Sequence, residues 1–138
     1  EGLGIVRRVH PERHSTEAKF LAAIGNVYSA QGKLDDAIAM KKKALRIYQK
    51  TMGPNSAEAG IALGNISFDL VKLGKHEKAL KKLEQALVIL QSALGDEHVE
   101  VGWTLHRMGV CKEEAGDRAG ALVCAREAHR IFSKRGVS

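Results

Sequence analysis

Residues 60–98 read GIALGNISFDLVKLGKHEKALKKLEQALVILQSALGDEH, and this stretch decides the fold class. Its first half repeats apolar residues at helical spacing and stops at Gly74, a residue type that ends helices without steric cost. Its second half carries an apolar stripe of the same period, which runs until Gly95. Because only a few residues connect the two halves, the pattern predicts two antiparallel helices packed on each other.

The same pattern recurs every 42 residues, with Gly32, Gly74 and Gly116 in register. A fixed period of this length indicates a stack of similar units, each of which needs its neighbours to bury its apolar face. The alanines of the second helices lie seven positions apart and let a neighbouring helix approach closely. The other matching columns are Leu21/Leu63/Leu105, Ile24/Ile66/Met108, Ala37/Ala79/Ala121, Ala44/Ala86/Ala128, Ile47/Ile89/Ile131 and Tyr48/Leu90/Phe132. We therefore predict an all-α protein of antiparallel helix pairs with these columns buried.

The composition agrees with a single helical domain. The chain has 138 residues, of which 44% are hydrophobic, 28% charged and 4% aromatic. It has no run of about 18 apolar residues, and its opening EGLGIVRRVHPERH lacks the apolar core of a signal peptide. We expect a cytoplasmic protein with no membrane segment.

Pro11 and Pro54 are predicted to lie in turns. Cys111 and Cys124 lack the spacing of a zinc site or a disulfide framework and are predicted to be small buried side chains.

The spacing of the glycines, alanines and large apolar residues resembles the tetratricopeptide repeat. The residues that carry this resemblance are Leu21, Ile24, Gly25, Tyr28, Gly32, Ala37 and Ala44 in the first unit, Leu63, Ile66, Gly74, Ala79 and Ala86 in the second, and Leu105, Met108, Gly109, Gly116, Ala121 and Ala128 in the third. Ser67 replaces one signature glycine, Lys112 replaces an aromatic residue, and the first aromatic column is leucine throughout. The resemblance implies a right-handed α-solenoid whose first helices line a concave groove and whose second helices form the outer face.

The period is longer than the 34 residues common in that family. The eight extra residues amount to about 12 Å of helix, which we expect on the second helix of each unit. A long second helix followed by the turn residues Leu94, Gly95, Asp96 and His98 is similar to the kinesin light chain type of the repeat. The resemblance implies an adaptor or scaffold with a role in cargo binding or beside a cytoskeletal motor.

The register divides the chain into three units and a leading segment. Residues 1–13 are predicted to be the tail of a preceding second helix and its turn, because Leu3 and Ile5 fit the second-helix columns. No polar capping helix follows the third unit, although solenoids normally need one. The chain is then a piece of a longer protein, a protein that self-associates through its uncapped ends, or a short chain with frayed ends. The predicted repeats span residues 14–55, 56–97 and 98–138.

The net charge of +6 originates in the second helices. In windows 33–50, 75–92 and 117–135, lysine and arginine outnumber aspartate and glutamate by more than two to one. This basic face is either a solvated surface that keeps the rod soluble or a patch for an acidic partner such as an acidic tail or RNA. Nucleic acid is disfavoured because aromatics for base stacking are not interleaved: Tyr48 and Phe132 fall in the buried column. The residues that carry the charge are Lys41, Lys42, Lys43, Arg46, Lys81, Lys82, Arg126 and Arg130.

The resemblance places the binding residues at exposed positions of the first helices. The candidates are Asn26, Asn65, Asp69, Lys72, Trp103, His106 and Arg107, together with Ser29, Ala30 and Glu113. Asn65 either holds the backbone of an extended peptide through its amide or faces solvent. Trp103 either anchors a partner side chain or packs beneath the preceding turn. Family members that grip chaperone C-termini use five positions, of which Asn26, Asn65 and Arg107 match three. Ala22 and Trp103 occupy the other two, so this ligand is not favoured.

No residue pattern in the sequence predicts catalysis. We find no glycine-rich phosphate loop, nucleophile motif or paired-carboxylate constellation. His10 and His14 are separated by Pro11 and do not indicate a metal pair, and His129 replaces a leucine and is expected to be half-buried. We therefore expect no enzymatic activity, metal or cofactor. The predicted function is a protein-binding module that holds a peptide segment in its groove, and the alternative is binding of nucleic acid or an acidic polymer to the basic second helices.

Overall fold

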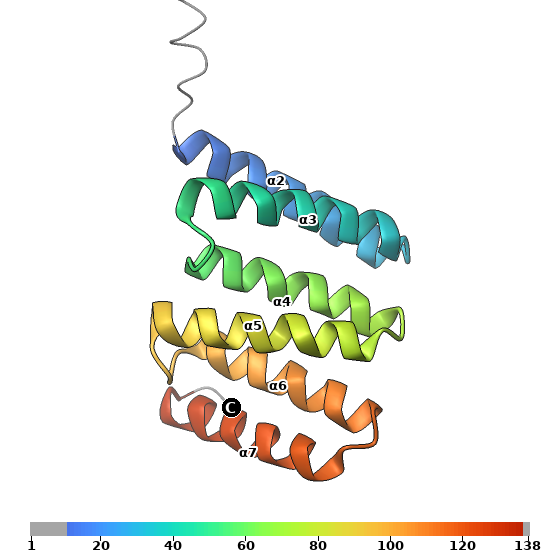
Figure 1. Ribbon diagram of the computed structural model, residues 1–138, viewed down its shortest axis with the longest axis vertical. Helices are drawn as coiled ribbons and strands as arrows, with labels where there is room; N and C mark the ends of the chain where they lie inside the picture. The colour runs from blue at the N-terminus through green and yellow to red at the C-terminus, as the bar shows by residue number, and fades with distance from the viewer. Residues whose placement is uncertain (1–10, 137–138) are drawn as a thin grey trace, which may run out of the picture.

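The computed structural model describes residues 11–136, and this part of the chain folds into six helices without a strand. The helices are α2 (Pro11–Ala30), α3 (Leu34–Met52), α4 (Ala57–Lys72), α5 (His76–Leu94), α6 (Val99–Glu114) and α7 (Arg118–Lys134). They form three antiparallel pairs stacked in chain order, and in Figure 1 α3 passes in front of α2. Each pair packs on the next, α3 against α4 and α5 against α6, and α4 also touches α6. The predicted all-α solenoid of helix pairs is confirmed.

The helices end where glycine permits a change of backbone direction. Gly74 and Gly95 have φ angles of +79° and +92°, in the region that favours glycine, and they follow the ends of α4 and α5. Pro54 lies in the connection between α3 and α4, as predicted. Pro11 does not lie in a turn: it is the first residue of α2, a position where the missing N–H of proline leaves no helical bond unmade.

Side-chain caps fix the starts of the later first helices. Ser56 Oγ accepts a hydrogen bond from the backbone N–H of Ala59 at 3.1 Å, at the start of α4. His98 Nδ1 accepts one from the backbone N–H of Glu100 at 3.0 Å, at the start of α6. Each cap satisfies one of the amides that the first turn of a helix leaves without a partner. His98 therefore has a structural role in the turn between units.

Small residues let the two helices of a pair lie close together. A Cβ atom on Gly60 would lie 2.9 Å from the side chain of Leu90, and one on Gly102 would lie 2.9 Å from Phe132. The buried alanines of the second helices are Ala37, Ala44, Ala79, Ala86, Ala121 and Ala128, as their columns predict. Cys111 and Cys124 are also buried, with free thiols.

Two predicted core positions are exposed. Ile24 is 43% exposed on α2, whereas its register equivalents Ile66 and Met108 are buried on α4 and α6, helices that each pack against the second helix of the preceding pair. His129 is exposed rather than half-buried. The prediction for residues 1–10, a tail of a preceding second helix, lies outside the described residues.

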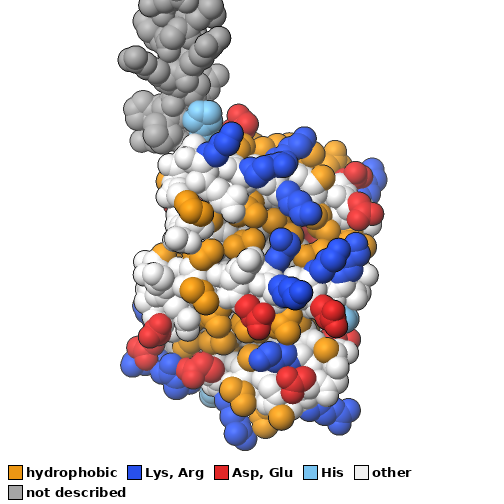
Figure 2. All heavy atoms as spheres, in the orientation of Figure 1, with side chains coloured by type: hydrophobic (Ala, Val, Ile, Leu, Met, Phe, Trp, Pro, Cys, Tyr) orange, Lys and Arg blue, Asp and Glu red, His pale blue; other side chains and the backbone are white. Residues whose placement is uncertain are grey.

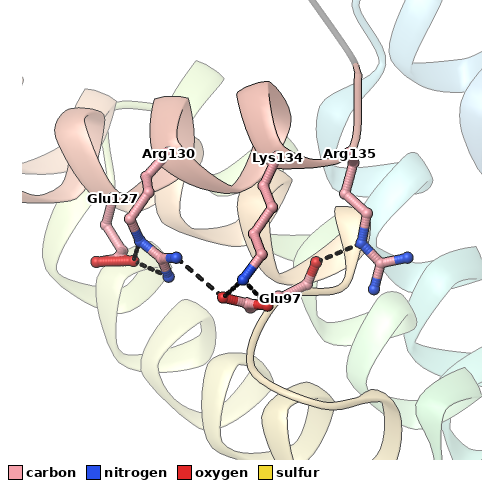
Figure 3. A network of polar contacts seen from close by, with 5 residues as sticks. All are labelled: Glu97, Glu127, Arg130, Lys134 and Arg135. Atoms are coloured by element: carbon pink, nitrogen blue, oxygen red, sulfur yellow. Dashed lines mark hydrogen bonds and ion pairs between the residues drawn. The ribbon is translucent and has the colours of Figure 1, made fainter.

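The turn between α5 and α6 is tied to α7 by a cluster of charges (Figure 3). Arg130 Nη1 and Lys134 Nζ lie 3.0 and 2.9 Å from carboxylate oxygens of Glu97, and Arg135 Nε donates to the Glu97 carbonyl oxygen at 2.8 Å. Arg130 also pairs with Glu127. The hydrogen bonds from Lys134 and then from Arg130 lower the pKa of Glu97. The last turns of α7 are therefore held against the preceding turn by groups that remain in contact with solvent.

Candidate functional site

A pocket of about 290 Å³ opens between the first helices α4 and α6. We call it the α4–α6 pocket. Its lining residues are Ser67, Phe68, Val71, Lys72, Leu83, Trp103, His106, Arg107 and Val110. Four of the predicted binding residues, Lys72, Trp103, His106 and Arg107, thus line the same pocket. A concave, mostly apolar surface with a few charged groups is the usual form of a binding site.

The walls of the α4–α6 pocket are aromatic and aliphatic side chains that remain partly exposed. Phe68, Trp103 and Val110 are 46%, 44% and 41% exposed. The Trp103 ring lies 5.0 Å from the ring of Phe132 on α7 and 5.9 Å from that of His106, between ring centroids. The Trp103 ring therefore packs against Phe132 and His106 of its own repeat unit, and it also lines the pocket. This arrangement suits an anchor for an apolar side chain of a ligand.

Two cations lie at the edge of these walls. Lys72 Nζ is 4.5 Å from the centroid of the Phe68 ring, and Arg107 Cζ is 6.0 Å from the same centroid. Burial lowers the pKa of Arg107, but an arginine pKa begins so high that the group keeps its charge. Gly64 gives the guanidinium its space, because a Cβ there would lie 3.2 Å from Arg107 Nη1. The pocket therefore combines an apolar floor with positive charge that attracts a carboxylate.

The two predicted asparagines lie elsewhere on the first helices. Asn65 lines a second hollow of about 220 Å³ between α2 and α4, beside Lys19 and Glu58. Asn26 is exposed on α2 and lines neither of these hollows. The three residues that match the chaperone-binding positions, Asn26, Asn65 and Arg107, are thus not gathered in one pocket.

Asp69 is not an exposed groove residue, contrary to the expectation from its helix position. Its side chain is completely buried, with Lys41 Nζ at 2.8 Å and the Ser29 hydroxyl donating to it at 2.7 Å. Lys41 is buried too, so it does not belong to the basic outer face. Both predictions fail for the same reason: a charged side chain can be buried at a helix interface when a partner of opposite charge faces it.

Phe68 and Val110 are pocket residues that the sequence reasoning missed. They occupy the same column of the 42-residue register as Asn26, which was named as a groove candidate. Extending the Asn26 column to the other two units would have identified both. Both are apolar residues within otherwise buried helix patterns, and only the packing of the helices leaves them 46% and 41% exposed.

Within residues 11–136, no three or more histidine, cysteine or acidic side chains are grouped in a way that would hold a metal ion. In the same part of the chain, no helix has both the length and the apolar character needed to cross a membrane.

The family model of the tetratricopeptide repeat matches residues 15–91 and residues 58–134. Since these matches cover most of the chain, the protein belongs to the tetratricopeptide repeat family, and the predicted resemblance is confirmed. Within that family, the long repeats are similar to those of kinesin light chains.

Protein KINESIN LIGHT CHAIN-RELATED 1 of Arabidopsis thaliana is 29% identical over 111 residues, which make up 80% of this chain and 18% of that protein. A putative kinesin light chain of Podosopora anserina with nearly identical TPR-like repeats has a TM-score of 0.74 at 19% identity, over 96% of this chain and 63% of that one. A Rap protein complexed with competence and sporulation factor has a TM-score of 0.77 at 24% identity, over 88% of this chain and 33% of that one. The chain therefore spans less than a fifth of the plant relative and about a third of the Rap protein.

Proposed function

We propose that this protein is a protein interaction module that holds an extended segment of a partner against its first helices. The observation that carries the proposal is the α4–α6 pocket, where Phe68 and Trp103 form apolar walls beside the cations Lys72 and Arg107. The ligand with matching chemistry is a peptide with a large apolar side chain followed by a carboxylate. In this proposal the next part of the same segment passes Asn65, which lines the hollow between α2 and α4.

The proposal includes an adaptor or scaffold role without catalysis, in the cytoplasm. The tetratricopeptide repeat family supports binding of a protein or peptide, and the similarity to kinesin light chains supports a link to cargo or to a cytoskeletal motor. The Rap protein of similar fold, complexed with competence and sporulation factor, supports ligand binding by such a solenoid.

The predicted self-association through uncapped ends remains a separate proposal, motivated by the exposed apolar stripe of Phe20, Ile24 and Val27 on α2. Sedimentation as a monomer at high concentration would contradict it.

The test uses a fluorescein-labelled decapeptide with a central leucine or tryptophan followed by two glutamates, measured by fluorescence anisotropy. One comparison peptide replaces the glutamates by glutamine, and another replaces the apolar residue by alanine. We expect the parent peptide to bind best, and Arg107→Ala or Trp103→Ala to weaken its binding by about tenfold or more, as for interface anchors. Arg126→Ala, an exposed change on α7, is the matched control. Equal binding of all three peptides, or binding indifferent to both pocket variants, contradicts the proposal.

Nucleic acid has weaker support as the ligand. The large exposed aromatic side chains of the described residues are Phe20, Phe68 and Trp103, and all three belong to first helices. The basic second helices therefore lack exposed aromatic rings on which bases would stack. A steep fall of affinity with salt, lost when Lys42 and Lys43 are changed to glutamate, would favour nucleic acid over the peptide.

A further inference from the structure

A third hollow, of about 320 Å³, lies between the second helices α3 and α5, away from the α4–α6 pocket. We call it the lysine cavity. Its lining residues are Asp35, Ile38, Ala39, Lys42, Leu70, Lys75, Lys78 and Lys82. Figure 2 shows lysine and arginine side chains gathered over α3 and the adjoining part of α5, whereas acidic side chains are more frequent towards α7. Four lysines with one aspartate around a single hollow form a local excess of positive charge.

The lysines of this cavity repel one another. Burial, and secondly the charge of Lys42, lower the pKa of Lys82, so an ammonium group on α3 acts on one on α5. The ion pairs found in residues 11–136 involve none of the four lysines. Lys75 is moreover the N-cap residue of α5 and makes no side-chain capping bond, and Lys78 lies in the first turn. Cations at a helix N-terminus are unfavourable, because the helix dipole is positive there. A bound anion would relieve both repulsions.

The cavity is specific to one place in the solenoid. At the equivalent boundary between α5 and α7, the register replaces Lys42, Lys75, Lys78 and Lys82 by Glu84, Asp117, Gly120 and Cys124, in that order, and it replaces Ala39 and Leu70 by Lys81 and Lys112. The lining positions are therefore net positive at the first boundary and net negative at the second, a contrast that solubility alone does not require. The charge difference between equivalent boundaries therefore indicates recognition.

We propose that the lysine cavity binds an acidic segment of a partner protein, at a site separate from the groove of the first helices. Lys75, Lys78 and Lys82 are spaced by three and four residues and so share one face of α5. They span about 10 Å along the helix, which equals roughly three residues of an extended chain. Ammonium groups along this length match carboxylates on such a segment. The solenoid then holds two segments at once, one against its first helices and one against its second helices.

The experiment measures binding of a labelled octapeptide of alternating glutamate and serine, with the glutamine–serine octapeptide as its uncharged counterpart. The test variant is Lys75→Glu with Lys78→Glu, both exposed positions. The matched control is Lys81→Glu with Arg126→Glu, which changes the net charge equally at exposed positions of second helices outside the cavity. Circular dichroism verifies that both variants are folded. We expect the cavity variant to weaken binding of the acidic octapeptide by about tenfold or more and the control to change it by about twofold or less.

Equal weakening by the two variants would overturn the proposal, because it would mean diffuse attraction by net charge. So would an acidic octapeptide that binds no better than its glutamine counterpart. If Arg107→Ala abolishes binding of this octapeptide, the peptide occupies the groove and the lysine cavity is not its site. A labelled oligothymidine that binds more tightly than the octapeptide, and loses affinity in the cavity variant alone, would assign the cavity to nucleic acid instead. The groove proposal is tested by other peptides and other variants, so either can fail alone.

Discussion

Lys41 Nζ lies 2.8 Å from Asp69 Oδ2, so a buried ion pair joins α3 of the first unit to α4 of the second. The Ser29 hydroxyl donates to the other carboxylate oxygen of Asp69 at 2.7 Å. At the next boundary the equivalent residues are Leu83 and Cys111, both buried. The same interface is thus built once with charges and once with apolar side chains, which provides an internal comparison.

Removing one partner of this pair is expected to destabilise the fold much more than replacing both. Lys41→Leu or Asp69→Cys alone leaves an unpaired buried charge, and each is expected to lower the free energy of unfolding by about 3–5 kcal/mol. The double variant reproduces the residues of the next boundary and is expected to lie within about 2 kcal/mol of the parent, because no charge is left unpaired. Urea denaturation of the four proteins measures this cycle. A double variant as unstable as the sum of the single changes would refute the expectation.

Two glycines on α4 are expected to respond differently to alanine. A Cβ on Gly60 meets the packed side chain of Leu90 at 2.9 Å, so Gly60→Ala is expected to lower stability by about 1–3 kcal/mol through overpacking. A Cβ on Gly64 meets only the guanidinium end of Arg107, at 3.2 Å. Gly64→Ala is therefore expected to keep or raise stability, since alanine favours a helix by about 1 kcal/mol over glycine. The same substitution is also expected to displace the Arg107 guanidinium and so to weaken binding of the decapeptide with an apolar residue and two glutamates. Thermal unfolding and anisotropy separate the two effects, and equal loss of stability in both variants would contradict them.

The Glu97 cluster is expected to make the attachment of α7 depend on pH. Lys134 and Arg130 hold the pKa of Glu97 below its ordinary value, so the carboxylate stabilises the folded state above about pH 4.3. This contribution is lost as the pH falls through the lowered pKa. Side-chain NMR titration of Glu97 should give a low midpoint, and Lys134→Ala with Arg130→Ala should raise it. An unchanged midpoint in the double variant would show that the two cations do not cause the shift.

The cap of α4 supplies a further test. Ser56→Ala removes the acceptor for the backbone N–H of Ala59 and is expected to lower the free energy of unfolding by about 1 kcal/mol. Ser92, exposed on α5, makes no such cap, so Ser92→Ala is the control and is expected to have little effect. Urea denaturation measures both. If the two variants lost the same stability, the cap would not be the cause.

The helices and the alanine columns could be predicted because their signals are local and repeated. Gly74 and Gly95 mark helix ends through backbone conformation alone, and Ala79 and Ala86 are buried by a period that the sequence displays directly. These features need no knowledge of which distant residues meet.

The burial of Asp69 could not be predicted in the same way. Its helix position is compatible with exposure, and only the packing of α3 against α4 brings Lys41, 28 positions earlier, to its carboxylate. Of the residues that line the α4–α6 pocket, the sequence indicates Lys72, Trp103, His106 and Arg107 as groove candidates, whereas Phe68 and Val110 require knowledge of which apolar residues stay exposed.

The contact of Trp103 with Phe132 couples the α4–α6 pocket to α7. No residue of α7 lines the α4–α6 pocket, yet the ring of Phe132 on α7 supports one wall of it. A ligand that binds only when this wall is in place stabilises the docked state of α7 by RT ln(1 + [L]/Kd) through mass action. Amide hydrogen exchange along α7 will therefore slow when the groove is filled, so the last helix reports on a ligand that it never touches.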